Sequence, residues 1–328
     1  MKKVKVGLMY SENECGSPLD SNIQFGWPGS INYRNIILEL IKHNVEIYNL
    51  KWGGVGRDLF VDKMYGLSNG RCLEGKSINY LDVLCFLGFG DISEVRDSDE
   101  KITEMVDRLH QNSEVLTINP TETVLRARKK KKKYLIDLYE QGFPIPDTFL
   151  VTSLEDLYTV SHDLLEKYEG YVTKPINGFR GFGVEKFPGG NLSVVEDIIK
   201  NDSEVLIQGF VPEIYTLGER SLFYFDGELK YTVLKESDEF IISRGDSIER
   251  TLINPTQEEE KLAEEVREFV APESLLARVD LIGDRCNPLL GEVTLSSLGM
   301  YTRVFDGKAK NIATDSYWDL IKKILKKQ

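Results

Sequence analysis

Two acidic residues near the carboxyl end of the chain give the first indication of chemistry. Asp280 lies in the apolar run Ala277 to Asp284, and Glu292 lies in the run Pro288 to Thr294. We expect both runs to be paired strands, joined by a turn at 284–287, with the two acids side by side. Adjacent buried carboxylates repel each other and shift their pKa values unless a cation lies between them. We expect that cation to be magnesium, which prefers oxygen ligands; exposed acids are the alternative that the apolar neighbours disfavour.

Four other segments point to nucleotide-dependent chemistry. The lysine run 129–133 lies in a helical segment, and a strand that ends at Lys174 leads into the glycine-rich loop 178–183. Backbone amides of such a loop can close over an anion. The apolar strand 205–211 has an end that can pair with an adenine edge, and Glu219 stands where it could hold ribose hydroxyls. Taken singly, the lysine run is more typical of a solvated helix face, the glycine loop is just as often a hairpin, and the segment 205–211 could be an ordinary core strand.

The segment Gly70 to Ser77 matches the phosphate-loop pattern GxxxxGK[ST] letter for letter. In phosphate-binding loops this pattern lies between a buried strand and a helix, whose amides hold the phosphate. Here residues 61–67 are a weak strand pattern, and the residues after Ser77 have no helical period. Glu74 would also place a carboxylate beside the phosphates. We therefore interpret this segment as a surface turn.

Composition argues against several other kinds of site and partner. The four cysteines and three histidines form no CxxC pair and no HExxH motif, so we expect neither a zinc site nor a Cys/His nucleophile. The chain has 41 Lys and Arg against 53 Asp and Glu, a charge of −12, which disfavours nucleic acid and anionic membranes. No apolar stretch reaches bilayer length and the first residues do not resemble a signal peptide, so we expect a cytoplasmic protein.

The pattern of elements predicts a mixed α/β and α+β fold. Over residues 1–118, short apolar runs alternate with helical periods, which is typical of a sheet with helices on both faces. A helical segment from 120 to 141 follows and ends before two prolines. Beyond residue 205 the chain is largely strand, with one helix at 257–269 and an amphipathic tail at 317–325.

Chain length and this order of elements together predict the domains. At roughly 150 residues per domain, 328 residues correspond to two or three domains. We predict an N-terminal α/β domain at 1–117, a central α+β lobe with the glycine loop at 118–204, and a C-terminal α+β lobe with the metal site at 205–328.

In their order and spacing these motifs resemble the ATP-grasp superfamily, and most of all its glutathione synthetase, RimK and D-alanine–D-alanine ligase branch. The motifs cover residues 118–297, and residues 1–117 fit the α/β domain that usually precedes the two ATP-grasp lobes. The resemblance implies a carboxylate–amine ligase. In such enzymes ATP phosphorylates a carboxylate, an amine attacks the acylphosphate, and an amide or peptide bond forms with ADP and phosphate as products.

The resemblance also implies roles for residues of this chain. The implied ATP contacts are Lys131, Lys174, Gly178, Arg180, Gly181, Gln208, the backbone of Gly209 and Val211, and Glu219 at the ribose. The implied ligands of Mg²⁺, or of Mn²⁺, are Asp280, Glu292 and Thr294. Arg278 would steady the oxyanion, and Lys235 and Arg244 are candidates for phosphate or carboxylate contact, with solvated surface charges as their alternative. Lys131 is selected by its spacing from Gly142 and Pro146, and its neighbours in the run remain open.

Three positions depart from the pattern of the family. Gly209 stands where many members have glutamate, Ser221 where arginine is frequent with Arg220 adjacent, and Thr294 where asparagine usually binds the metal. A threonine hydroxyl can coordinate magnesium, but more weakly. Two other classes therefore stay open: a phosphotransferase that uses the same ATP site or, less expected, the segment Gly70 to Ser77, and a non-catalytic nucleotide-binding protein.

The expected partners are ATP and small carboxylate and amine substrates, such as amino acids or a peptide, whose identity the sequence does not name. A homodimer also stays open.

Overall fold

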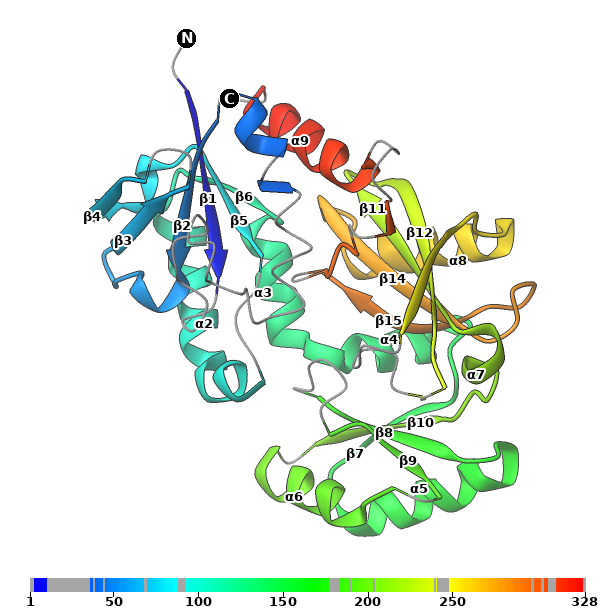
Figure 1. The fold of residues 1–328 in the computed structure, drawn as a ribbon. Helices are drawn as coiled ribbons and strands as arrows, with labels where there is room; N and C mark the ends of the chain where they lie inside the picture. Colours follow the sequence, from blue (N-terminus) through cyan, green and yellow to red (C-terminus); the bar gives the residue numbers. More distant parts are fainter. Residues whose placement is uncertain are drawn as a thin grey trace.

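The computed structural model describes residues 3–10, 36–37, 39–43, 45–67, 70–87, 92–176, 183–188, 190–202, 204–238, 240, 248–295, 298–301, 304–305 and 311–326. Three β-sheets organise this part of the chain, and Figure 1 shows them as three groups of strands with the C-terminal helix lying over two of them. Among the described residues, no helix has the length and apolar character needed to cross a membrane.

The first sheet belongs to the N-terminal part of the chain and is largely parallel. Its strand order is β4-β3-β2-β1-β5-β6, in which β1 pairs in parallel with β2 and β5, and β5 with β6, while β3 and β4 add an antiparallel edge. Its strands are β1 (Val4–Tyr10), β2 (Val45–Lys51), β3 (Phe60–Gly66), β4 (Cys72–Ser77), β5 (Val83–Phe86) and β6 (Leu116–Ile118).

Helices cover both faces of this sheet, as the alternating pattern predicts. Helices α2 (Ile92–Asn112) and α3 (Thr121–Lys130) share a buried cluster with one face, in which Met105 and Val124 lie against Leu84. The opposite face packs against Leu40 and against the C-terminal helix α9 (Ile312–Leu325). The expected α/β architecture of residues 1–118 is therefore confirmed.

The phosphate-loop pattern Gly70 to Ser77 falls on β4, the edge strand of the first sheet. It runs antiparallel to β3 and is followed by the short 3₁₀ helix η3 (Ile78–Tyr80), and Lys76 is exposed. The segment is thus an edge strand rather than a surface turn. It nevertheless lacks the strand–loop–helix context that phosphate binding needs, as expected.

The second sheet is antiparallel, with the order β7-β10-β8-β9. Its strands are β7 (Thr148–Val151), β8 (Tyr171–Pro175), β9 (Glu185–Phe187) and β10 (Val205–Gly209), and helices α5 (Leu154–Lys167) and α6 (Leu192–Asp202) cover one face. Because β10 pairs with β7 and β8, the strand at 205–209 belongs to the central lobe. We therefore propose the boundary to the third segment after Gly209 instead of after residue 204.

The third sheet is also antiparallel, with the order β13-β12-β11-β14-β15. The short helix α7 (Ile214–Leu217) leads into β11 (Glu219–Phe225), which is followed by β12 (Glu228–Glu236), β13 (Glu249–Ile253), β14 (Leu276–Ile282) and β15 (Leu289–Thr294). Helix α8 (Gln257–Val270) and helix α4 (Tyr134–Glu140) pack on one face, where Leu222, Val279 and Leu262 are buried together.

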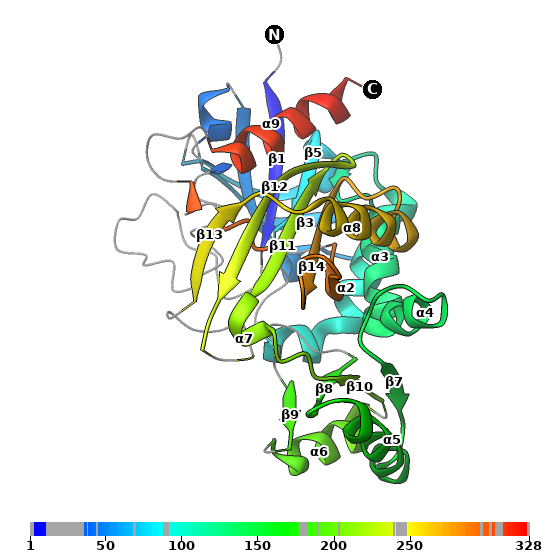
Figure 2. The same cartoon turned by 90° about the vertical axis from the view of Figure 1, so that its right-hand side faces the viewer.

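The other face of the third sheet is divided along its strands. Phe223, Phe225 and Tyr231 join α9 and the first sheet in one buried cluster. The remaining part of this face carries charged side chains of β11, β12, β14 and β15. Figure 2 shows the ends of β11 and β12 near α7 directed toward the second sheet. The candidate site therefore lies on the charged part of this sheet face.

Candidate functional site

The predicted metal acids lie directly opposite each other on neighbouring strands. Asp280 on β14 pairs with Glu292 on β15, and the next pair along the same two strands is Arg278 with Thr294. On the other side of β14, Asp280 pairs with Ser221 of β11. A bulge follows Asp280, where Leu281 pairs with Leu290 and one extra residue is left in β15. The four residues that the sequence places on two strand faces are thus brought together.

Asp280 is the centre of a network of buried charges. Its side chain is 2% exposed, and Arg278 donates to it from Nε (2.9 and 3.0 Å) and from Nη2 (2.7 Å). The hydroxyl of Ser221 donates to Oδ1 at 2.5 Å. Burial raises the pKa of Asp280, but the charges of Arg278 and Lys235 and the hydrogen bonds outweigh this and hold the pKa below its usual value. Asp280 is therefore a carboxylate at neutral pH.

Arg278 is fixed from several directions. Nη2 also donates to Thr294 Oγ1 (3.1 Å), and Nη1 donates to the carbonyl of Leu298. Its side chain is only 12% exposed. Arg278 is therefore a buried part of the site and not a solvated cation on the surface.

Glu292 presents the least occupied carboxylate of the site. It is partly exposed and, within the described ranges, forms no hydrogen bond or ion pair. Together with Asp280 and the hydroxyl of Thr294 it makes a donor set of oxygen atoms only, which is the set that Mg²⁺ prefers. No cluster of three or more His, Cys, Asp and Glu side chains gathers in the described part of the chain. A metal held here would therefore rely on two carboxylates, with Thr294 and the phosphates of the nucleotide as further oxygen donors.

Lys235 on β12 is part of the same cluster. It pairs across the strands with Glu219 of β11, forms an ion pair with it, and lies 3.8 Å from an oxygen of Asp280. Only 3% of its side chain is exposed, so the interpretation of Lys235 as a solvated surface charge is wrong. The ion pair also means that Glu219, the expected ribose ligand, already has one cationic partner.

Lys174 lies in the second sheet, on β8. Its Nζ donates to Gln208 Oε1 (2.6 Å), and Gln208 in turn donates to Thr148 Oγ1 (2.9 Å). Burial, with a smaller contribution from the positive charge of Lys132, lowers the pKa of Lys174 to about 8, while the charge of Glu292 opposes this. The charge of Glu292 thus acts on Lys174 although the two residues belong to different sheets.

The structure gives the reason for the glycine at position 209 of the expected adenine linker. A Cβ atom at Gly209 would lie 2.6 Å from the ring of Tyr168, so a side chain has no room there. The amide of Gly209 donates to the carbonyl of Asp147 (3.0 Å), which leaves its carbonyl as the candidate contact for adenine. Val211 is buried at the end of the same segment.

Several predicted residues lie outside the described part of the chain. These are Gly178, Arg180, Gly181 and Arg244, and the side chain of Lys131. Lys131 begins the 3₁₀ helix η4 (Lys131–Lys133) between α3 and α4. Of its neighbours, Lys132 acts electrostatically on Lys174, whereas Lys133 forms an ion pair with Glu204 (2.7 Å). Lys132 is therefore a second candidate for the first ATP-binding lysine.

Two residues that position the site were not predicted. The hydroxyl of Tyr134 accepts from the amide of Val293 (2.7 Å) and donates to its carbonyl (3.2 Å), so α4 holds the edge strand beside Glu292. The side chain of Asn119 donates to the carbonyls of Leu276 and Leu295, both at 2.6 Å. It thereby ties β14 to the chain just after β15. The sequence gives no indication of either role. Tyr134 simply follows the lysine run, and Asn119 follows β6.

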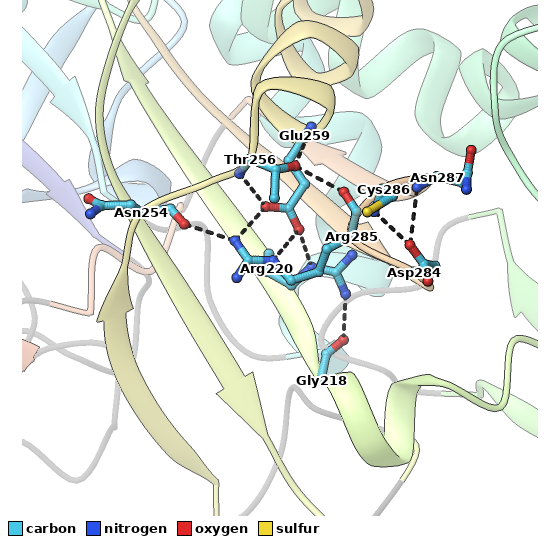
Figure 3. Close-up of polar contacts among 9 residues, drawn as sticks. All are labelled: Gly218, Arg220, Asn254, Thr256, Glu259, Asp284, Arg285, Cys286 and Asn287. Atoms are coloured by element: carbon cyan, nitrogen blue, oxygen red, sulfur yellow. Dashed lines mark hydrogen bonds and ion pairs between the residues drawn. The ribbon is translucent and has the colours of Figure 1, made fainter.

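Arg220 does not replace the arginine that the family often has at position 221. Figure 3 shows it on the α8 side of the sheet, where Nε binds Glu259 Oε1 (2.8 Å) and both side chains are fully buried. Arg285, from the turn between β14 and β15, binds the same carboxylate (2.9 Å) and the carbonyl of Asn254 (2.8 Å). This cluster holds the turn of the β14–β15 hairpin against the start of α8, on the face opposite the candidate site.

Comparisons with known proteins agree with this architecture. The sequence matches no protein-family model and no curated protein. The fold is similar to that of D-cycloserine synthetase DcsG (17% identity, TM-score 0.66, 98% of this chain and 99% of that one). It is also similar to D-alanine–D-alanine ligase from Bacillus anthracis complexed with ATP (16% identity, TM-score 0.61, 100% and 99%). A third similar structure is ATP-grasp ligase PsnB with minimal precursor, Mg and ADP (14% identity, TM-score 0.57, 98% and 99%). Over its whole length, this chain therefore has the fold of the ATP-grasp ligases.

Proposed function

We propose that this protein is an ATP-dependent carboxylate–amine ligase that works through an acylphosphate. The observation that carries the proposal is the cluster of Arg278, Asp280 and Glu292 on one sheet face. Lys174 on β8 of the central lobe supplies a further cation for the phosphates. Structures of the same fold are described as ligases, one of them complexed with ATP and another with Mg and ADP. A phosphotransferase could share the ATP site, but it would have no evident need for a buried arginine beside the metal acids.

The residues divide the reaction between them. Lys174, with Lys131 or Lys132, would align the phosphates while the γ-phosphoryl group moves from ATP to an oxygen of the substrate carboxylate and ADP leaves. The amine then attacks the carbonyl carbon, a C–N bond forms, the C–O bond to phosphate breaks, and the amine proton leaves to solvent. Arg278 would donate to the oxyanion of the tetrahedral intermediate. Magnesium held by Asp280, Glu292 and Thr294 would neutralise phosphate charge when bound.

The contacts of Asp280 limit how a metal ion could bind to it. Arg278 Nε–H, one Nη2–H of Arg278 and the Ser221 hydroxyl present three donor hydrogens to Asp280, whose carboxylate offers about four lone-pair sites. A metal ion on Asp280 would therefore share this carboxylate with Arg278. Any N–H group of Arg278 that the metal displaced would be available for the substrate.

The direct test is turnover with product identification. The protein is incubated with ATP, Mg²⁺ and pooled amino acids, and phosphate release and product masses are measured. We expect ADP, phosphate and a new amide in equal amounts. A phosphorylated product without an amide would show a kinase, and tight ATP binding without turnover on any pool would show a binding protein.

The two lysines of the competing phosphate motifs should differ in ATP binding. Lys174→Ala would remove a charge-assisted phosphate contact, whose loss typically costs about 1.5–3 kcal/mol, or roughly 10-fold to 150-fold in Kd. Lys76→Ala changes an exposed side chain on an edge strand and should leave Kd within about two-fold. Titration with a fluorescent ATP analogue measures both. A larger effect from Lys76→Ala would contradict the assignment of the ATP site.

The affinity for ATP should also fall as the pH rises from 7 to 9. The pKa of Lys174 is lowered to about 8 by burial, so in the free protein its charged form is lost as the pH passes that value. Phosphate favours the charged form, so binding near pH 8 should take up a proton. Calorimetry in buffers of different ionisation enthalpy measures this uptake. Lys174→Met is the control, and it should remove both the proton uptake and the pH dependence of Kd between 7 and 9.

A further inference from the structure

The strand that carries two of the expected metal ligands has little support from its own sheet. β15 is the last strand in the order of the third sheet, and within the described ranges only β14 pairs with it. The bulge in this pairing lies directly before Glu292, where Gly291 is the extra residue. A bulge disrupts the ladder locally, and an edge strand leaves one row of backbone groups without a strand partner. The position of Glu292 therefore depends on a second restraint.

The hydroxyl of Tyr134 supplies that restraint from outside the sheet. It accepts from the amide of Val293 at 2.7 Å and donates to the carbonyl of the same residue at 3.2 Å. One oxygen thus satisfies both backbone groups of this residue at the free edge. Glu292 and Thr294 lie on either side of Val293, and the alternation of the strand places both on the opposite face from the Val293 side chain. Tyr134 therefore holds the backbone midway between two of the expected ligands.

The surroundings of Tyr134 keep the proton on its hydroxyl. Burial raises the pKa of this phenol well above its usual value, and the charges of Glu292 and Asp280 raise it further, against the hydrogen bond to Val293 and the charge of Arg278. A tyrosinate could accept from the amide of Val293 but could not donate to its carbonyl. The neutral phenol makes both contacts.

The helix that carries Tyr134 is fixed independently of this hydroxyl. Leu135 and Leu138 of α4 are buried in one cluster with Leu206 of the second sheet and Leu290 of β15. Figure 1 shows α4 between the second and third sheets, and α4 begins directly after the lysines of η4. Because leucine side chains hold the helix, loss of the hydroxyl should release the edge of β15 without moving α4 or the lysines.

We propose that Tyr134 is a positioning residue for the metal site, whose hydroxyl fixes β15 on α4 and thereby holds Glu292 and Thr294 in place for the metal ion. Residues that orient a metal ligand without touching the metal commonly affect the affinity for the metal. The proposal rests on the metal site of the proposed function. It concerns positioning and adds no chemical step.

The affinity for a non-hydrolysable ATP analogue, with and without metal, tests the proposal. Calorimetry on the whole protein gives Kd in excess Mg²⁺ and in EDTA, and the ratio of the two values measures the coupling between metal and nucleotide. Tyr134→Phe keeps the ring and removes the partner of the Val293 backbone. We expect Kd in Mg²⁺ to rise by about 3-fold to 10-fold, the effect of one lost hydrogen bond, and Kd in EDTA to stay within about 2-fold.

Two further variants show whether the hydroxyl acts through the metal ligands. Tyr139→Phe removes a hydroxyl of the same helix that bonds Asp147 (3.3 Å) instead of β15, and it should leave both Kd values unchanged. Glu292→Gln should lower the coupling as well, and adding Tyr134→Phe should then have little further effect, because the ligand that it positions is already lost. The thermal midpoint of each variant checks folding.

Amide exchange gives a readout that involves neither metal nor nucleotide. In the metal-free protein, the amide of Val293 should exchange about 10-fold faster in Tyr134→Phe than in the wild type. Unchanged exchange at Val293 would overturn the proposal. Faster exchange with an unchanged ratio of the Kd values would also overturn it, because the contact would then be structural only. A full effect of Tyr134→Phe in the Glu292→Gln background would do the same.

These measurements separate the role of Tyr134 from the ligase function, since none of them requires a product. If no substrate pool yields an amide, the ligase function fails, and the Kd ratio still decides the role of Tyr134. If Glu292→Gln leaves the ratio unchanged, the metal site is wrong and the proposal falls with it. If Glu292→Gln lowers the ratio and Tyr134→Phe does not, only the positioning role of Tyr134 is overturned.

Discussion

Replacing Glu292 by Gln should abolish most turnover and leave the folded protein intact. The side chain forms no hydrogen bond or ion pair within the described ranges, so the change removes a charge without breaking a contact. A neutral amide is a poor substitute for a carboxylate that binds magnesium and phosphate. Because a catalytic metal contributes several kcal/mol to the transition state, we expect kcat to fall by about 100-fold or more.

The measurement is kcat over a range of magnesium concentrations, with the thermal midpoint as the check on folding. Glu264→Gln, an exposed glutamate on α8, is the control and should have normal activity. Asp280→Asn should lose turnover as well, but it also breaks the buried pair with Arg278. Breaking such a pair costs about 3–5 kcal/mol, so Glu292→Gln is the cleaner variant. Full activity of Glu292→Gln at limiting magnesium would remove Glu292 from the metal site.

Substituting Arg278 should separate amide formation from ATP binding. If its guanidinium stabilises the tetrahedral intermediate, Arg278→Lys should reduce amide formation by about 10²–10³-fold, the usual cost of losing one oxyanion donor. Lysine keeps the charge beside Asp280 but cannot copy the planar fork that now makes four contacts at the site. The Kd for ATP should stay within a few-fold of that of the wild type.

Nucleotide affinity and amide product are measured side by side on one preparation of the variant. Arg278→Ala serves as the comparison, and it should be less stable because Asp280 then keeps only Lys235 and Ser221. If affinity and product fall in parallel in the lysine variant, then Arg278 holds the nucleotide or the fold, and its assignment to the oxyanion has to be dropped.

The sequence alone predicts the main elements of the fold and the pairing of the two metal acids. Strand periodicity is local, so the runs around Asp280 and Glu292, with a short turn between them, are sufficient to predict a hairpin. The alternation of the first 118 residues likewise predicts helices on both faces of a sheet, and the structure confirms this. The β4 strand is missed because polar and glycine residues at an exposed edge show no apolar alternation.

Only the tertiary structure decided which charged groups meet. Arg220 and Ser221 are neighbours in the sequence, but successive side chains of a strand point to opposite faces of the sheet. Arg220 is therefore buried against Glu259, whereas Ser221 binds Asp280. Other contacts join residues from different segments of the chain. Lys235 pairs with Glu219, Tyr168 leaves no room for a side chain at Gly209, and Arg250 lies near the ring of Tyr301. Such contacts depend on strand register and on which elements pack over a face. No local pattern specifies either, because both are set by the burial of the whole core.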